Sequence, residues 1–170
     1  MTLFGGSYFF YITIMLAIPT IVLGCLGKNQ KYYGFLVSLL MVYMTMKDSP
    51  VAIAYMAAYC VLELLIVKGY QMICTRGIKS NKLYYLFVTL SLMPLVIWKI
   101  TSFTGVGKGI FAFIGISYMS FKSIQMIIEI HDGLIKEVSA FEFLYFLIFF
   151  PSVLSGPIER SRDFHRDLTE

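Results

Sequence analysis

The feature that most constrains this chain is a series of apolar runs separated by short basic or mixed-charge segments. A helix of about 20 apolar residues spans the hydrocarbon core of a bilayer. Only 14% of the residues are charged and 58% are hydrophobic, against about 25% and about 45–50% in soluble domains. The sequence therefore predicts an all-α, polytopic bundle of about five or six membrane helices. We expect these helices at residues 8–26, 32–46, 51–67, 83–98, 109–130 and 141–154.

The distribution of basic residues predicts the orientation of the bundle, because Lys and Arg gather in cytoplasmic loops. The loop with Lys28 and Lys31 and the segment 68–82 are basic, whereas the segment 47–50 between them has no net charge. This alternation predicts a multi-pass protein of the plasma membrane with an extracellular N-terminus. The run 8–26 follows no basic residue, which favours a retained first helix, bent at Pro19, over a cleaved signal peptide. We treat residues 1–170 as a single membrane domain that ends in a charged segment at 155–170.

Charge and cysteine content exclude several classes of protein. The net charge of +4 resides in loops between apolar runs, and no nucleic-acid-binding motif is present. Cys25, Cys60 and Cys74 form no CxxC pair and have no histidine partner, so neither a zinc site nor a disulfide framework is indicated. We interpret them as small apolar packing residues.

Ionisable residues inside membrane segments are costly and mark candidate sites. Glu63 interrupts the run 51–67. It is either a proton or cation partner inside the bundle, or a structural residue that pairs with a nearby lysine or lies near the interface. Lys68 is five positions away, and we favour the structural interpretation.

The segment 115–133 carries a stripe of polar residues. At about 100° per residue, their spacings of 4, 3, 4 and 3 place the members within a sector of roughly 80° on one helix face. The stripe has one lysine and two acids, whereas helices that lie in the membrane interface usually carry several basic residues. We expect this helix inside the bundle, where the stripe either lines a polar path or packs on other polar helices, and where Gln125 and Glu129 can share an i, i+4 hydrogen bond. The stripe residues are Tyr118, Lys122, Gln125, Glu129 and Asp132.

The two histidines are weak candidates for catalysis. His131 precedes Asp132 and Gly133 at an expected helix end, and His165 lies in the charged tail. Neither occupies a pocket-like apolar context, although histidine is the usual general base near neutral pH. Pro151 and Gly156-Pro157 break the last helix, and Arg160 and Arg162 after them could bind an anionic group or anchor the helix end.

Two sequence blocks resemble the membrane-bound O-acyltransferase (MBOAT) family. The first is GISYMSFKSIQMIIEIHDGLIKE at 115–137, and the second is FPSVLSGPIERSRDF at 150–164. They occur in order, separated by a short apolar helix, and the likeness is greatest to the branch that D-alanylates teichoic acid. One departure is His131, where the family pattern leads us to expect arginine. The residues that match the family pattern are Ser117, Tyr118, Phe121, Pro151, Ser155, Gly156, Pro157 and Arg160.

The resemblance implies a membrane transferase of the Gram-positive cell envelope. In that family the acyl donor is the phosphopantetheine thioester of a D-alanyl carrier protein, the acceptor is a hydroxyl of lipoteichoic acid, and a tunnel joins the two. No bound cofactor or metal is implied, and the bilayer and other D-alanylation proteins are the expected partners. The resemblance also places the family's essential histidine on a later helix beyond Glu170, so no catalytic residue is carried over. We therefore expect an N-terminal portion that is inactive alone.

Two alternatives stay open at this stage. One is a fragment related to O-acetyltransferases that modify cell-surface polysaccharide. The other is a non-catalytic membrane protein that acts as a scaffold or in transport, although no inverted repeat is visible.

Overall fold

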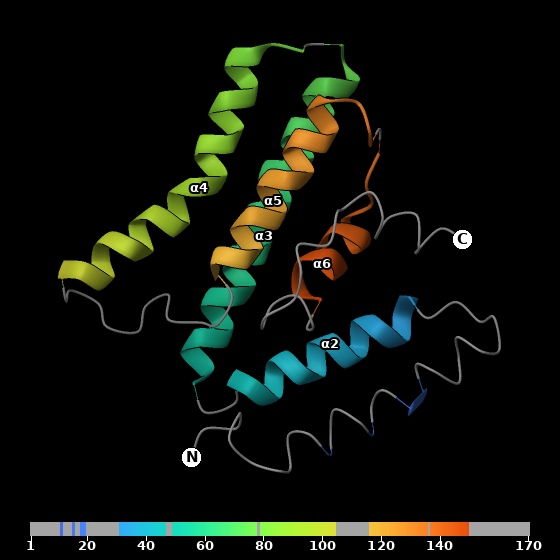
Figure 1. Cartoon of the computed structure of the whole chain (residues 1–170), viewed down its shortest axis with the longest axis vertical. Helices are drawn as coiled ribbons and strands as arrows, with labels where there is room; N and C mark the ends of the chain where they lie inside the picture. Colours follow the sequence, from blue (N-terminus) through green and yellow to red (C-terminus); the bar gives the residue numbers. More distant parts are fainter. Residues whose placement is uncertain are drawn as a thin grey trace.

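The computed structural model describes residues 31–46, 49–77, 79–104, 116–135 and 137–149, together with positions 11, 15, 18 and 19. Within these residues the predicted all-α class is confirmed. The five helices, drawn in Figure 1, are α2 (Lys31–Met46), α3 (Pro50–Thr75), α4 (Asn81–Thr104), α5 (Ile116–His131) and α6 (Ala140–Ile148).

The helix α5 lies at the centre of the described bundle. It runs alongside α3 and packs against α3, α4 and α6, while α2 lies across one end of α3 and contacts α6 (Figure 1). The largest fully buried side chains include Tyr70 of α3, Ile127 of α5, and Phe143 and Phe146 of α6. The interior position predicted for this helix is thus confirmed, because a helix lying in the membrane interface would leave its polar face to solvent.

Two of the described helices, α3 and α4, are long and apolar enough to cross a membrane. Only 11% of the most apolar stretch of α4 is buried inside the bundle. Its exposed side chains include Leu86, Leu90, Met93 and Ile97. A soluble protein rarely exposes so large a contiguous apolar surface, whereas lipid accommodates it without cost.

Pro94 lies in the middle of α4 and cannot donate the backbone hydrogen bond that Leu90 would accept four residues earlier. The helix bends along its length, and its C-terminal half diverges from α3 and α5 (Figure 1). A proline is among the few features that kink a helix sharply. The divergence explains why so much of α4 is left to the lipid.

Local sequence signals set the described helix ends. Ser49 caps α3, with its Oγ accepting from the N–H of Ala52 at 3.4 Å, and Pro50 occupies the first turn. Gly133 has φ +76 after α5, and the N–H of Leu134 donates to the carbonyl oxygen of Glu129 at 3.0 Å. That bond is the 6→1 contact of a Schellman motif, in which glycine adopts the left-handed conformation without strain.

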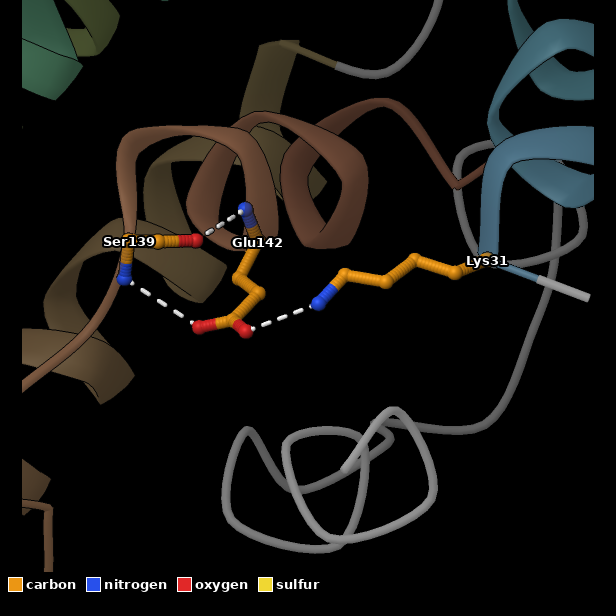
Figure 2. Close-up of polar contacts among 3 residues, drawn as sticks. All are labelled: Lys31, Ser139 and Glu142. Carbon is orange, nitrogen blue, oxygen red and sulfur yellow. Dashed lines mark hydrogen bonds and ion pairs between the residues drawn. The ribbon is translucent and has the colours of Figure 1, made fainter. Parts of the chain in front are cut away.

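The start of α6 is fixed to the start of α2 by a polar contact that Figure 2 shows. Ser139 and Glu142 form a capping box, and Glu142 Oε1 also pairs with the ammonium of Lys31 at 3.0 Å. The two helices also meet at Gly34, where an added Cβ would overlap the hydroxyl of Tyr145. Glycine at this position lets α6 approach the backbone of α2 closely.

Several predicted boundaries differ from the structure. The prediction that 68–82 is a loop is wrong at its start, because α3 continues to Thr75 and only a short turn precedes α4. The helix α4 likewise extends to Thr104, beyond position 98 where the predicted helix ends.

The other predicted segments agree only in part or lie outside the described residues. The second run agrees with α2, and α5 begins at Ile116, with 109–115 outside the described residues. Of the predicted first helix only four positions are described, and they are helical. The segment from Phe150 to the tail, with His165, Arg160 and Arg162, also lies outside the described part.

Candidate functional site

The predicted polar stripe follows one side of α5, but its members differ in burial. Lys122 and Glu129 are buried, and Tyr118 and Gln125 are half-buried. Asp132 is exposed, because α5 ends at His131 and Asp132 lies in the turn that follows. The structure therefore brings the first four together on the helix and places the fifth just beyond its C-terminal end.

The hydrogen bond expected between Gln125 and Glu129 is confirmed. Gln125 Nε2 donates to Glu129 Oε1 at 3.1 Å. Gln125 Oε1 has no hydrogen-bond partner among the described residues, although it is shielded from solvent. This pair is thus a polar element on α5, and Gln125 Oε1 is a buried acceptor without a hydrogen-bond partner among the described residues.

Lys122 has a partner that the stripe did not suggest. Its ammonium group donates to the backbone carbonyl oxygen of Phe146 at 2.6 Å and lies 4.8 Å from the Phe146 ring centroid. A second ring, that of Phe149, is 5.9 Å away. A cation stabilises the C-terminal end of a helix, so Lys122 joins α5 to the end of α6.

The residues of the first family block surround these groups. Ser117 is half-buried, and Phe121 is 58% exposed on the outer side of α5. The residues of the second block, from Pro151 to Arg160, lie outside the described residues. Phe121 therefore faces lipid or another part of the protein, rather than the interior of the described bundle.

The expected pairing of Glu63 with Lys68 is wrong. Glu63 is fully buried, and its Oε2 accepts a hydrogen bond from Ser91 of α4 at 2.7 Å. The ammonium group of Lys68 turns away from it and donates to the carbonyl oxygen of Val138 and, at 3.3 Å, to Gln71. A five-residue spacing on a helix does not bring two side chains together, which is the physical reason for the error.

His131 lies in an aromatic environment, which the sequence alone did not indicate. Its Nδ1 is 2.7 Å from the hydroxyl of Tyr70, and its ring stacks on Tyr84 with centroids 4.4 Å apart. Lys79 from the turn after α3 reaches its backbone carbonyl oxygen at 3.4 Å. The histidine thus fastens the end of α5 to α3 and α4. Tyr70 and Tyr84 lie far from His131 in the sequence, so no local pattern could have revealed them.

Chemically, the described part offers binding and positioning groups. No cluster of three or more His, Cys, Asp or Glu that could hold a metal occurs among the described residues. Cys60 and Cys74 carry free thiols, Cys60 being buried and Cys74 half-buried. Along α5, Gln125, Glu129 and Tyr118 present an amide, a carboxyl and a phenol.

Comparison with known proteins identifies relatives over nearly the whole sequence. The chain is 31% identical over 174 residues to a teichoic acid D-alanyltransferase of Bacillus subtilis, an alignment that covers 98% of this chain. Proteins of the same name from Streptococcus thermophilus and Lacticaseibacillus rhamnosus are 32% and 35% identical over 95% of it. The chain is homologous to the teichoic acid D-alanyltransferases. The resemblance to membrane-bound O-acyltransferases is thereby confirmed.

The alignment covers less than half of each teichoic acid D-alanyltransferase. This chain spans 44%, 39% and 40% of their respective lengths. No protein-family model matches the sequence. The chain thus resembles part of a teichoic acid D-alanyltransferase.

Proposed function

We propose that this chain is the N-terminal membrane part of a protein that transfers D-alanyl groups to teichoic acid in the Gram-positive cell envelope. The observation that carries the proposal is the similarity to three teichoic acid D-alanyltransferases over 95–98% of the chain. The lipid-facing apolar surface of α4 supports a place in the plasma membrane. We further propose that the basic turn between α3 and α4 faces the cytoplasm, which places the N-terminus outside.

The transfer itself exchanges one acyl bond for another. The carbonyl carbon of the D-alanyl group leaves the thioester sulfur of a phosphopantetheine arm on a carrier protein and forms an ester with a hydroxyl of lipoteichoic acid. A general base takes the proton of that hydroxyl, and the thiol is released. Because a thioester is already activated, positioning and exclusion of water supply much of the remaining acceleration. By family resemblance the base is a histidine outside this chain.

Within this scheme α5 contributes one wall of the path that the donor follows. Tyr118, Gln125 and Glu129 offer a phenol, an amide and a carboxyl along one side of the helix. Such groups suit the amides and hydroxyls of a phosphopantetheine arm, whose own backbone is polar at intervals. Lys122 then has a positioning role, because its ammonium group is bound to α6.

A complementation experiment tests the proposal. The chain is expressed alone, and together with the remaining part of a relative, in a Gram-positive strain that lacks its own D-alanyltransferase. Ester-linked D-alanine on teichoic acid is then measured. We expect D-alanine only when both parts are present. D-alanine from the chain alone, or acetyl esters in its place, would contradict the proposal.

The role of α5 is tested in a full-length relative by substitutions at the positions that align with Gln125 and Lys122. We expect Gln125→Leu and Lys122→Met to reduce transfer while the protein still accumulates in the membrane. A substitution aligned with Phe121→Leu, on the outer side of α5, is the matched control and should keep transfer near the starting level. Full transfer in the first two variants would exclude α5 as a wall of the path.

A further inference from the structure

The helices α3, α4 and α5 pack against one another (Figure 1). A group of buried polar side chains lies on these three helices. It consists of the carboxyl of Glu63 and the hydroxyls of Tyr59, Ser91, Ser120 and Ser123. Glu63 and all three serines are 0% exposed, and Tyr59 is 3% exposed. The proposed transfer reaction uses none of these groups. A buried acid inside a membrane bundle nevertheless needs a physical explanation, because the bilayer offers no water to solvate it.

The hydroxyl protons of this junction can be assigned. Ser120 Oγ donates its one proton to the carbonyl oxygen of Ile116 at 2.9 Å. The hydroxyl of Tyr59 lies 2.8 Å from Ser120 Oγ and must therefore be the donor of that pair. With its proton on Ser120, the oxygen of Tyr59 can accept a hydrogen bond from the neighbouring carboxyl.

The carboxyl group of Glu63 has one donor and lacks a second. Ser91 Oγ donates to Oε2 at 2.7 Å. Oε1 has no hydrogen-bond partner among the described residues, and neither does Ser123 Oγ, although Ser123 interacts with the same carboxyl. An ionised carboxylate accepts hydrogen bonds at both oxygens. Here only Oε2 has a donor within hydrogen-bond distance among the described residues.

Among the residues that the structure describes, no cationic side chain is recorded against Glu63. The titratable groups that interact with Glu63 are Tyr59 and Cys60, both of which are neutral at pH 7. Across the described residues, the salt bridge that forms joins Lys31 to Glu142, and Lys68 and Lys122 are bound to backbone carbonyl oxygens elsewhere. A buried carboxylate without a counter-charge is strongly unfavourable.

We propose that the α3–α4–α5 junction is a proton-binding site in which Glu63 is held as a neutral carboxylic acid. Its Oε1 takes a proton from water and donates it in a hydrogen bond to the oxygen of Tyr59 or Ser123, while Oε2 accepts from Ser91. In this form both carboxyl oxygens of Glu63 have a hydrogen-bond partner, and the acid fixes the positions of the three helices relative to one another. The inference does not depend on the proposed function, because it rests on the burial, the hydrogen bonds and the charges around Glu63.

Infrared spectroscopy of the full chain in detergent micelles at neutral pH tests this directly. We expect an absorption band of a protonated carboxyl group that is lost in Glu63→Gln. The matched control is Glu142→Gln, which removes a carboxyl group paired with Lys31 and should leave the band unchanged. Absence of the band from the unchanged chain, or its persistence in Glu63→Gln, would overturn the proposal.

Thermal unfolding provides a second readout if a variant folds poorly. The amide of glutamine has one acceptor and a donor, like the neutral acid, so Glu63→Gln should unfold near the temperature of the unchanged chain, whereas Glu63→Leu should unfold at a lower one. The measurement is repeated with sodium chloride and with choline chloride. Stabilisation by sodium that Glu63→Gln abolishes would show a metal cation in place of the proton and would refute the inference.

Discussion

The ammonium group of Lys122 lies 2.6 Å from the backbone carbonyl oxygen of Phe146, so that one side chain connects the centre of α5 with the last turn of α6. Lys122 is only 4% exposed, and the rings of Phe146 and Phe149 flank it. A buried cation needs hydrogen-bond acceptors to offset its lost hydration, and the carbonyl groups at a helix C-terminus supply them.

Replacing Lys122 should weaken the contact between α5 and α6. We expect Lys122→Met to lower the free energy of unfolding by about 1–3 kcal/mol, the usual range for a hydrogen bond to a charged group. Denaturant unfolding in detergent micelles measures the change. Lys99→Met is the matched control, since Lys99 is exposed on α4, and it should unfold like the unchanged chain. Equal stability of both variants would show that Lys122 contributes nothing to the bundle.

The packing of α2 on α6 depends on the absence of a side chain at position 34. A Cβ there would overlap the Tyr145 hydroxyl, so we expect Gly34→Ala to destabilise the protein by about 1–3 kcal/mol, as overpacking does. Tyr145→Phe removes the overlapping oxygen and should restore part of the loss in the double variant. A double-mutant cycle measures this coupling. Strictly additive effects of the two substitutions would contradict the close approach of the helices.

Two interactions hold the start of α6 in Figure 2, the capping box of Ser139 and the ion pair between Lys31 and Glu142, and substitutions can separate them. Ser139→Ala removes the cap of the helix and should cost about 0.5–2 kcal/mol. Lys31→Met removes a partly exposed ion pair, together with a contact of its ammonium group 5.8 Å from the Phe141 ring centroid, and should cost about 0.2–1 kcal/mol. Unfolding free energies of the two variants, compared with the unchanged chain, check the order. A larger loss for Lys31→Met would mean that the ion pair, and not the cap, holds α6.

Local patterns predicted part of this structure. Each of the five described helices lies in a predicted apolar run, although α3 and α4 extend beyond theirs. The i, i+4 spacing predicted the bond between Gln125 and Glu129. The capping box at Ser139 follows the S-x-x-E pattern and could also have been found in the sequence. Each of these signals lies within a few residues of the group that it explains.

Local sequence patterns could not predict contacts between residues that lie far apart in the sequence. The end of α3 was missed because Lys68 and Gln71 are polar, yet Lys68 reaches the carbonyl oxygen of Val138 and remains on a buried helix. The partners of Glu63 were missed because Ser91 lies 28 positions away and serine carries no periodic signal. Only the packing of α3, α4 and α5 brings these residues together.

The account depends most on the assignment of the outer side of α4 to lipid. Single cysteines at positions 90, 93 and 97, in a chain whose native cysteines are changed to alanine, report on that surface. Cysteines at positions 132 and 137, both exposed near the end of α5, serve as controls. Each variant is treated in permeabilised cells with a charged, membrane-impermeant maleimide.

Labelling of these cysteines tests the account most directly. We predict that positions 132 and 137 react, whereas positions 90, 93 and 97 stay unlabelled until detergent dissolves the bilayer. Reaction at the three α4 positions as fast as at the two controls would place that surface in water and contradict the membrane assignment.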